Sequence, residues 1–179
     1  MKITETNLSG VYLIEPDFIE DSRGFFTRAF CQDEFASAGI DFAPVQSNIS
    51  HNRLAYTLRG MHFQAAPYAE TKLVRCTSGR LFDVAVDLRE SSPTYRQWTG
   101  LDLSRQNAKA LFIPAGCAHG FLTLEDETEV FYQMSPAFVP GHDRGFRFDD
   151  PAIGITWPKT PKVISEKDLA LPLFDEAEI

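Results

Sequence analysis

Two side chains that could together remove a proton beside a carbonyl group, His62 and Lys72, lie close to each other in the sequence. His62 falls in the strand-like run Thr57 to Gln64, and Lys72 follows in the next apolar run. An imidazole accepts a carbon-bound proton near neutral pH, and an ammonium stabilises the negative charge that then develops on the carbonyl oxygen. The pair predicts proton abstraction next to a ketone, a chemistry that needs no metal ion.

Each of these residue types also has a purely structural explanation. A single histidine is more often a core residue whose ring is bonded to the backbone, and tyrosine is common in strands. Lys72 could be a solvated strand residue. The combination of His62, Lys72 and Tyr132 in one short chain favours the catalytic interpretation for His62.

The elements that must position these groups are mostly strands. Short apolar runs alternate with turn residues, and no helical period persists in the middle of the sequence, which indicates an all-β sandwich or barrel. Val11 to Ile14 predicts an early strand, and Gln32 to Ala38 predicts one short helix that Gly39 ends. Further strands are expected at Ala110 to Ile113, Gly120 to Leu124 and Glu129 to Met134.

The run Leu81 to Leu88 alternates strictly. Phe82, Val84, Val86 and Leu88 fall on one face, and Asp83, Ala85 and Asp87 fall on the other. This period of two predicts a sheet with one dry side.

The C-terminal region changes composition after Asp149-Asp150-Pro151, where proline and charged residues become frequent. Ser165-Glu166-Lys167-Asp168 has the spacing of a helix N-terminus, in which an acid at the third position after the serine is common. We therefore expect a single domain over residues 1–179, with a short helical appendage at about 159–179.

Composition and charge narrow the possible partners. The chain has 179 residues, 44% of them hydrophobic, and a net charge of −8, so one domain with a substantial core is expected and nucleic acid is not an expected partner. No apolar stretch is long enough to cross a bilayer and no basic segment precedes an apolar run, so we expect no membrane partner and a cytoplasmic location. Cys31, Cys76 and Cys117 are expected to be reduced thiols.

A second histidine stands in a recognisable motif. Pro114-x-Gly116-x-x-His119 resembles the second histidine motif of the cupin jelly roll. A metal-binding cupin would offer a second histidine where this chain has Gln64. A three-ligand metal site of His62, Glu70 and His119 is therefore kept as an alternative.

Nearly the whole chain resembles the nucleotide-sugar epimerases typified by dTDP-4-dehydrorhamnose 3,5-epimerase. The matching segments are Asp21-Ser22-Arg23-Gly24-Phe25-Phe26, Gln46-Ser47-Asn48, Leu58 to Gln64, Lys72-Leu73-Val74-Arg75, Gly79 to Arg89, Ile113 to Phe121, Tyr132, Asp149-Asp150-Pro151 with Trp157-Pro158, and Ser165-x-Lys167-Asp168 before Pro172-Leu173. The resemblance implies a cupin-like jelly-roll homodimer, with strand exchange between subunits and no cofactor. It also implies epimerisation at C3 and C5 of a nucleoside-diphosphate 4-keto-6-deoxyhexose.

The resemblance also assigns roles to the catalytic candidates. His62 would be the base, and Asp168 would orient its imidazole and stabilise the charged form. Lys72 would stabilise the enolate at C4. Tyr132 would return a proton on the ring face opposite the base, because inversion requires a donor on that side.

Further candidates would support or bind the substrate. His119, backed by Asp83, would complete the electrostatic environment of the reacting centre. The residues implied in substrate binding are Arg23 and Arg59 for the diphosphate, together with Phe26, Gln46 and Asn48. The chain has Arg28 and Phe138 where glutamate and tyrosine are common in the family, so the identity of the nucleobase is left open.

The predicted strand at Leu58 to Gln64 carries an open question. Strict alternation places Arg59 and His62 on opposite faces, which a bulge or a strand given to the partner subunit's site would reconcile.

The sequence leaves three other functions as alternatives. These are epimerisation at only C3 or C5 of a sugar with another nucleobase, a metal-dependent cupin reaction, and sugar-nucleotide binding without catalysis.

Overall fold

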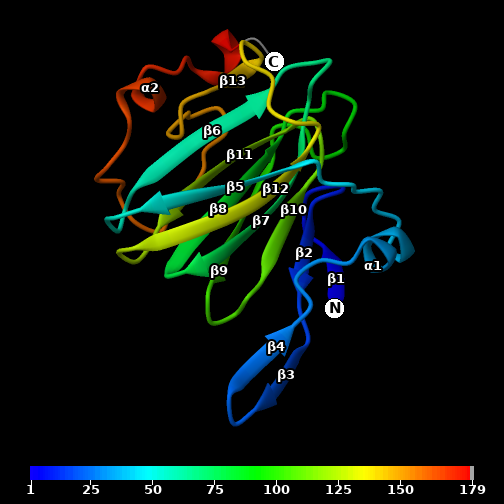
Figure 1. Ribbon diagram of the computed structural model, residues 1–179. Coiled ribbons are helices and arrows are strands. Elements are labelled where there is room, and N and C mark those ends of the chain that lie inside the picture. The colour runs from blue at the N-terminus through cyan, green and yellow to red at the C-terminus, as the bar shows by residue number, and fades with distance from the viewer. Residues whose placement is uncertain (178–179) are drawn as a thin grey trace.

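The computed structural model describes residues 1–177, and strands dominate it (Figure 1). The strands are β1 (Lys2–Glu5), β2 (Tyr12–Glu15), β3 (Phe18–Asp21), β4 (Gly24–Thr27), β5 (Gln46–Asn52), β6 (Leu58–Gln64), β7 (Thr71–Ser78), β8 (Arg80–Asp87), β9 (Trp98–Ser104), β10 (Ala110–Ile113), β11 (Cys117–Thr123), β12 (Thr128–Ser135) and β13 (Asp143–Gly145). The helices are α1 (Gln32–Ser37), α2 (Glu166–Leu169) and the 3₁₀ turn η1 (Phe174–Glu176). The all-β prediction and the early helix are confirmed.

Two antiparallel sheets form the body of the molecule. The six-stranded sheet has the order β1-β2-β10-β7-β12-β5, and the five-stranded sheet has the order β13-β6-β11-β8-β9. A core between them is built from alternate residues of both sheets, among them Val74, Leu81, Leu111, Phe121 and Val130. Because side chains alternate along each strand, the same inward-facing rows can carry polar groups toward an open end of the sandwich.

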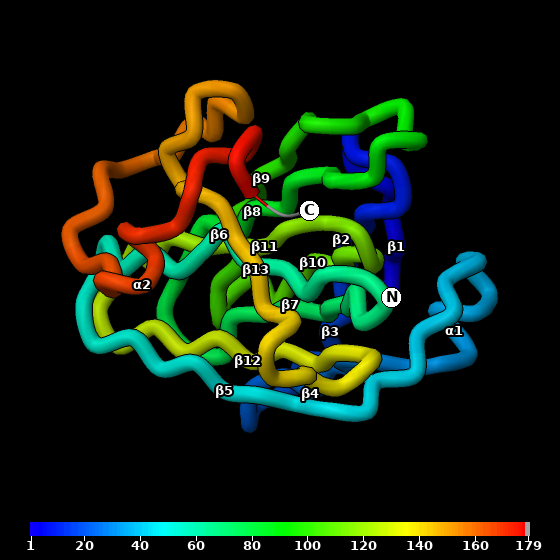
Figure 2. The backbone as a smooth tube through the Cα atoms, turned by 90° about the horizontal axis from the view of Figure 1, so that it is seen from above, coloured from blue at the N-terminus to red at the C-terminus, as the bar shows by residue number. Residues whose placement is uncertain are grey.

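The outer face of the five-stranded sheet is covered by the C-terminal part of the chain. Val84 and Val86 of β8 pack there against Phe146 and Phe174. Figure 2 shows this segment, in orange and red, lying on the side of the molecule away from β5 and β12. The prediction of one wet face for β8 is wrong, because Asp83 on its inner face is fully buried as well.

The β3–β4 hairpin extends away from the two sheets as a separate two-stranded sheet (Figure 1). Its tight turn is stabilised locally, since the Arg23 backbone N–H donates to the Asp21 side chain over 2.8 Å and Gly24 has a φ of +128°. Phe25 and Phe26 are 52% and 69% exposed. The hairpin therefore presents apolar surface that its own chain does not cover.

A bulge in β6 answers the question of which way its side chains face. His119 of β11 pairs with His62, and Phe121 pairs with Arg59, so three residue steps on β6 lie opposite two on β11. The extra residue fits because a Cβ at Gly60 would lie only 2.6 Å from the Gly120 Cα. The bulge turns Arg59 and His62 toward the same side of the sheet.

The C-terminal tail contains only α2 and η1 as helical elements among its described residues. The predicted appendage at 159–179 is therefore short, and its last two positions, 178 and 179, lie outside the described residues. The single-domain organisation stays a prediction.

Cys31, Cys76 and Cys117 form no disulfide, as expected. No helix within residues 1–177 is both long and apolar enough to cross a membrane.

Candidate active site

One pocket of about 720 Å³ opens between the two sheets. Its walls come from both sheets and from the C-terminal tail. Eight of the predicted functional residues line it: Gln46, Asn48, Arg59, His62, Lys72, His119, Tyr132 and Asp168. Asp83 lies behind this wall, where it contacts His119. The structure therefore brings most of the predicted site residues together in one pocket.

His62, the candidate base, is in contact with the carboxylate of Asp168. The His62 Nε2 lies 2.7 Å from the Asp168 Oδ1, and the Gly60 N–H points at the second carboxylate oxygen over 3.4 Å. Burial favours the neutral acid. However, the hydrogen bond and charge of His62, together with Gly60 and Ser165, outweigh burial and hold the pKa of Asp168 below its usual value. Asp168 is thus held as a carboxylate that fixes the ring of His62.

Asp168 has a helix-capping position as well as this contact. Its backbone N–H donates to the Ser165 Oγ over 3.0 Å at the start of α2. Asp168 therefore makes both contacts that the sequence suggests, one at the helix start and one with His62, while its catalytic role stays a prediction. The cap helps to fix the carboxylate relative to β6.

Lys72 is paired with Glu70, an acid that the sequence suggests only as a metal ligand. The Lys72 Nζ lies 2.6 Å from the Glu70 Oε1, and both side chains are largely buried. The second Glu70 oxygen accepts the Gln64 backbone N–H over 2.7 Å. This contact holds the flexible lysine side chain at one place in the pocket wall. The remaining N–H donors of its ammonium group can then bond to a substrate oxygen.

His119 and Asp83 form a second histidine–carboxylate pair, as expected. The His119 Nε2 lies 2.7 Å from the Asp83 Oδ1, and Asp83 is fully buried between the sheets. His119 stands directly opposite His62 in the β6–β11 ladder. Both imidazoles therefore lie on the same wall of the pocket, each backed by a buried carboxylate.

Tyr132 belongs to the other wall. It lies on β12 in the six-stranded sheet, whereas His62 lies on β6 in the five-stranded sheet, and both line the pocket. Burial raises the pKa of the Tyr132 phenol, an effect that Arg59 opposes and Glu70 reinforces. A neutral phenol and an imidazole thus face the same space from different sheets.

The polar rim of the pocket could hold an anion. The exposed guanidinium of Arg59 lies near the inward-facing row of β5 that includes Gln46 and Asn48. The Gln46 Nε2 donates to the Asn48 Oδ1 over 3.0 Å, and the Gln46 Oε1 accepts the Phe138 N–H over 2.9 Å. These contacts order a polar strip next to an exposed aromatic ring.

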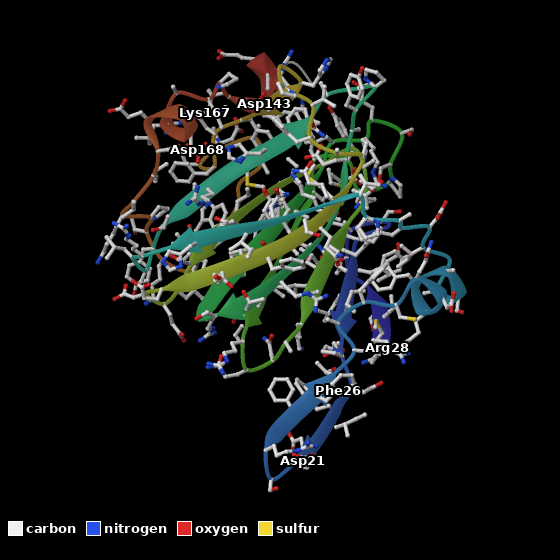
Figure 3. All side chains as sticks on the ribbon, in the orientation of Figure 1. Asp21, Phe26, Arg28, Asp143, Lys167 and Asp168 are labelled. Atoms are coloured by element: carbon white, nitrogen blue, oxygen red, sulfur yellow. The ribbon has the colours of Figure 1, made fainter. Side chains whose placement is uncertain are left out.

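Arg23 and Phe26 do not reach this pocket in their own chain. Arg23 lies on the β3–β4 hairpin, where its guanidinium is paired with Asp21 over a contact of 2.5 Å and is almost fully exposed. Figure 3 shows Asp21 and Phe26 on the projecting hairpin, far from Asp168 at the opposite end of the molecule. These two predicted binding residues are separated from the others within a single copy.

Several pocket residues had no assigned role in the sequence. Asp143 and Lys167 stand at the rim and form an ion pair of 2.7 Å, and Figure 3 shows them next to Asp168. The sequence contains little that would mark them as pocket residues, because Lys167 is simply the residue before Asp168 and Asp143 lies on a strand of only three residues. Other lining residues without a predicted role are Ile49, Ser50, His51, Phe63, Phe121, Met134, Arg144, Ser165 and Leu171.

The alternative metal site is not formed in the described part of the chain. Within residues 1–177, no three His, Cys, Asp or Glu side chains converge in a way that could hold a metal ion. Glu70 instead gives one oxygen to Lys72 and the other to a backbone N–H. The donor set of His62, Glu70 and His119 therefore does not fit a three-ligand centre.

Comparison with known proteins shows which family the chain resembles over its whole length. The family model described as dTDP-4-dehydrorhamnose 3,5-epimerase matches residues 5–176. A Sinorhizobium fredii protein of that name is 45% identical over 180 residues, covering 100% of this chain and 92% of the relative.

Two solved structures are similar over almost their whole length. The epimerase from Bacillus anthracis with TDP and PPi bound has a TM-score of 0.93 and 42% identity, covering 96% of this chain and 98% of the other. The Legionella pneumophila enzyme in complex with dTDP-4-keto-L-rhamnose has a TM-score of 0.92 and 36% identity, covering 98% and 93%. This chain therefore belongs to the dTDP-4-dehydrorhamnose 3,5-epimerase family.

Proposed function

We propose that this chain is an isomerase that epimerises C3 and C5 of a nucleoside-diphosphate 4-keto-6-deoxyhexose. In particular, we propose that it converts dTDP-4-dehydro-6-deoxy-D-glucose to dTDP-4-dehydro-L-rhamnose. Family membership supports the substrate class. The observation that carries the mechanism is the pocket in which His62 and Lys72 share space with Tyr132 from the other sheet.

His62 is proposed to remove the proton next to the C4 ketone. The C–H bond breaks, its electron pair forms the enolate, and the proton moves to the imidazole. Asp168 holds the ring and stabilises the imidazolium, since its carboxylate contacts the Nε2 over 2.7 Å. A general base of this kind contributes about 10²–10⁴-fold to the rate.

Lys72 is proposed to stabilise the enolate oxygen at C4. Charge develops on that oxygen only as the proton leaves, so the ammonium binds the transition state more strongly than the ketone. The His119–Asp83 pair places a second imidazole on the same pocket wall as His62, where it would complete the electrostatic environment of the reacting centre.

Tyr132 is proposed to return a proton to the opposite face of the ring. Its position on the other sheet and its raised pKa support a phenol that stays protonated until it donates. One removal and one delivery from opposite faces invert a centre. Once the imidazolium has released its proton to solvent and the phenolate has taken one up, the same steps on the other side of the ketone invert the second centre.

The nucleotide is proposed to lie along the polar rim. Arg59 would bind the diphosphate, while Gln46 and Asn48 would donate hydrogen bonds to phosphate or sugar. Phe138 lines the pocket and is 47% exposed, so its ring could stack on a nucleobase. Since Phe138 has no hydroxyl, the identity of the base is left to the ligand panel below.

We further propose a homodimer in which the hairpins are exchanged. Ile19 is 67% and Phe26 is 69% exposed on the hairpin, and a lone two-stranded sheet with such residues is normally covered by a partner. A second copy would receive Arg23 and Phe26 at its pocket, where the family resemblance assigns them to substrate binding. A cytoplasmic location and the lack of a cofactor stay predictions.

Turnover of a 4-keto sugar tests the proposed activity. Purified protein with excess chelator is incubated with dTDP-4-dehydro-6-deoxy-D-glucose and with the cytidine, uridine and guanosine analogues, and the product is identified by NMR. We expect dTDP-4-dehydro-L-rhamnose. A product inverted at one carbon would reduce the assignment to a single-site epimerase. Activity that chelator abolishes and a stoichiometric metal restores would favour the metal-dependent alternative.

A further inference from the structure

Most other arginine side chains in the described chain are paired with a carboxylate, whereas Arg59 is bonded to a neutral amide. Ion pairs with carboxylates engage Arg23, Arg28, Arg80, Arg89, Arg96 and Arg147. Arg59 instead donates from its Nε to the Asn52 Oδ1 over 2.8 Å, and no carboxylate within residues 1–177 forms an ion pair with it. Its positive charge is therefore not cancelled by an acid at the pocket rim.

The surroundings of Asn52 hold its Oδ1 toward Arg59. Its side chain is 2% exposed, and its Nδ2 donates to the backbone oxygens of Ser50 over 3.1 Å and Thr128 over 3.2 Å. These two donations fix which way the amide points, because only the oxygen is left to face the Arg59 Nε–H. A buried amide with its donors satisfied in this way has little freedom to turn.

The contact joins the two sheets. Asn52 ends β5, at the edge of the six-stranded sheet, and Arg59 lies on β6 of the five-stranded sheet. With its Nε engaged, the guanidinium keeps its two terminal nitrogens for a ligand. That fork matches two oxygens of a phosphate.

We propose that Asn52 is a positioning residue that holds Arg59 as an anion-binding group, and that its neutrality is part of the role. An aspartate at the same place would accept the same hydrogen bond but would cancel the charge that attracts the ligand. The amide orients Arg59 and leaves its charge available to a diphosphate. The inference rests on the proposed function only in taking that ligand to be a nucleoside diphosphate.

The first experiment compares anionic and uncharged ligands in the full-length protein. Binding of dTDP and of inorganic pyrophosphate is measured by calorimetry for wild type, Asn52→Ala and Asn52→Ser, and thymidine is measured as an uncharged competitor. Loss of a hydrogen bond that orients a charged group predicts about tenfold weaker binding of both anions. Thymidine binding and kcat at saturating substrate should change by less than about threefold. The matched control is Asn107→Ala, which removes an amide that orders a turn outside the pocket and should leave all constants unchanged.

A double-mutant cycle asks whether Asn52 acts through Arg59. In an Arg59→Met background, the Asn52 substitution should cause no further loss of dTDP affinity. Thermal unfolding is recorded for every variant, and Asn52→Ser is used if Asn52→Ala does not fold.

Three results would overturn the proposal. They are wild-type anion affinity in a folded Asn52 variant, an equal loss for thymidine and dTDP, and a full additional loss in the Arg59→Met background. A wild type that binds dTDP but converts no 4-keto sugar would instead contradict the proposed function and leave this inference standing.

Discussion

Glu70 holds the Lys72 ammonium at 2.6 Å, although the sequence had suggested Glu70 only as a metal ligand. Three active groups of the pocket share this arrangement, because His62 contacts Asp168 and His119 contacts Asp83. Lys72, His62 and His119 are thus each fixed by a buried acid behind them. In the proposed reaction the substrate would meet groups whose positions are already set, as electrostatic catalysis requires.

Lys72→Met should lower kcat about 10²–10³-fold, the usual cost of losing a group that stabilises an oxyanion. The substitution also leaves the buried Glu70 carboxylate without its partner, so the thermal midpoint should fall. Adding Glu70→Gln should restore stability but not the rate. Steady-state kinetics and thermal unfolding of both variants check this, and a double variant with wild-type kcat would contradict the role of Lys72.

Tyr132→Phe should separate proton removal from inversion. His62 remains able to form the enolate, but the donor on the other wall is lost, so protons return mainly from the face they left. In D₂O the unconverted substrate should gain deuterium while product appears much more slowly. Product formation and deuterium content are followed together by NMR. Inversion at the wild-type rate would show that Tyr132 is not the acid.

Acid should destabilise the protein partly through Asp87, which lies outside the pocket. Burial favours its neutral form, but hydrogen bonds from Arg89, Ser92 and Thr94 outweigh burial and hold the pKa of Asp87 at about 2. A carboxylate with a depressed folded pKa contributes stability that is present above its unfolded pKa of about 3.9 and is lost as pH falls through the folded value. The free energy of unfolding should therefore decrease between about pH 4 and pH 2.

The substitution Asp87→Asn isolates this contribution. It should lower the free energy of unfolding at pH 7 and flatten its dependence on pH between about 4 and 2. Urea unfolding at several pH values measures both effects. Asp102→Asn is the control, because its ion pair with Arg80 is exposed and should contribute little. An unchanged pH profile in Asp87→Asn would contradict this assignment.

Mixing two inactive variants tests the proposed hairpin exchange. In a heterodimer of Arg23→Ala and His62→Asn subunits, exchange gives the first subunit's pocket an intact His62 and the partner's hairpin with Arg23. Random pairing of equal amounts should recover about one quarter of wild-type activity. If each hairpin served its own pocket, no site would be complete and no activity would return. Co-expression with two affinity tags supplies the heterodimer.

The sequence predicted the strands well because their alternation is local, and it placed most pocket residues through matching segments. It could not predict that both faces of β8 are buried, since Phe146 and Phe174 come from far along the chain. The orientation of Arg59 relative to His62 depended on a bulge that the close approach of Gly60 to Gly120 makes possible. Such contacts between distant segments leave no periodic signal.

The polar contacts behind the active groups were harder to foresee. Glu70 and Lys72 stand two residues apart, but the pair could be recognised only once both side chains were known to face one pocket. The sequence gives no signal for the role of Asn52, because a single asparagine near a strand end usually indicates a turn. Asp168 was identified through the resemblance, and the structure adds its contact with His62.

Deuterium exchange tests the central claim that His62 removes protons on both sides of the C4 ketone. Wild type and His62→Asn are incubated with dTDP-4-dehydro-6-deoxy-D-glucose in D₂O, with His142→Asn as the control, since His142 packs against Tyr68 and does not line the pocket. We predict deuterium at C3 and C5 for wild type and the control, and exchange about 10²–10⁴-fold slower for His62→Asn. Wild-type exchange rates in a folded His62→Asn enzyme would contradict the account.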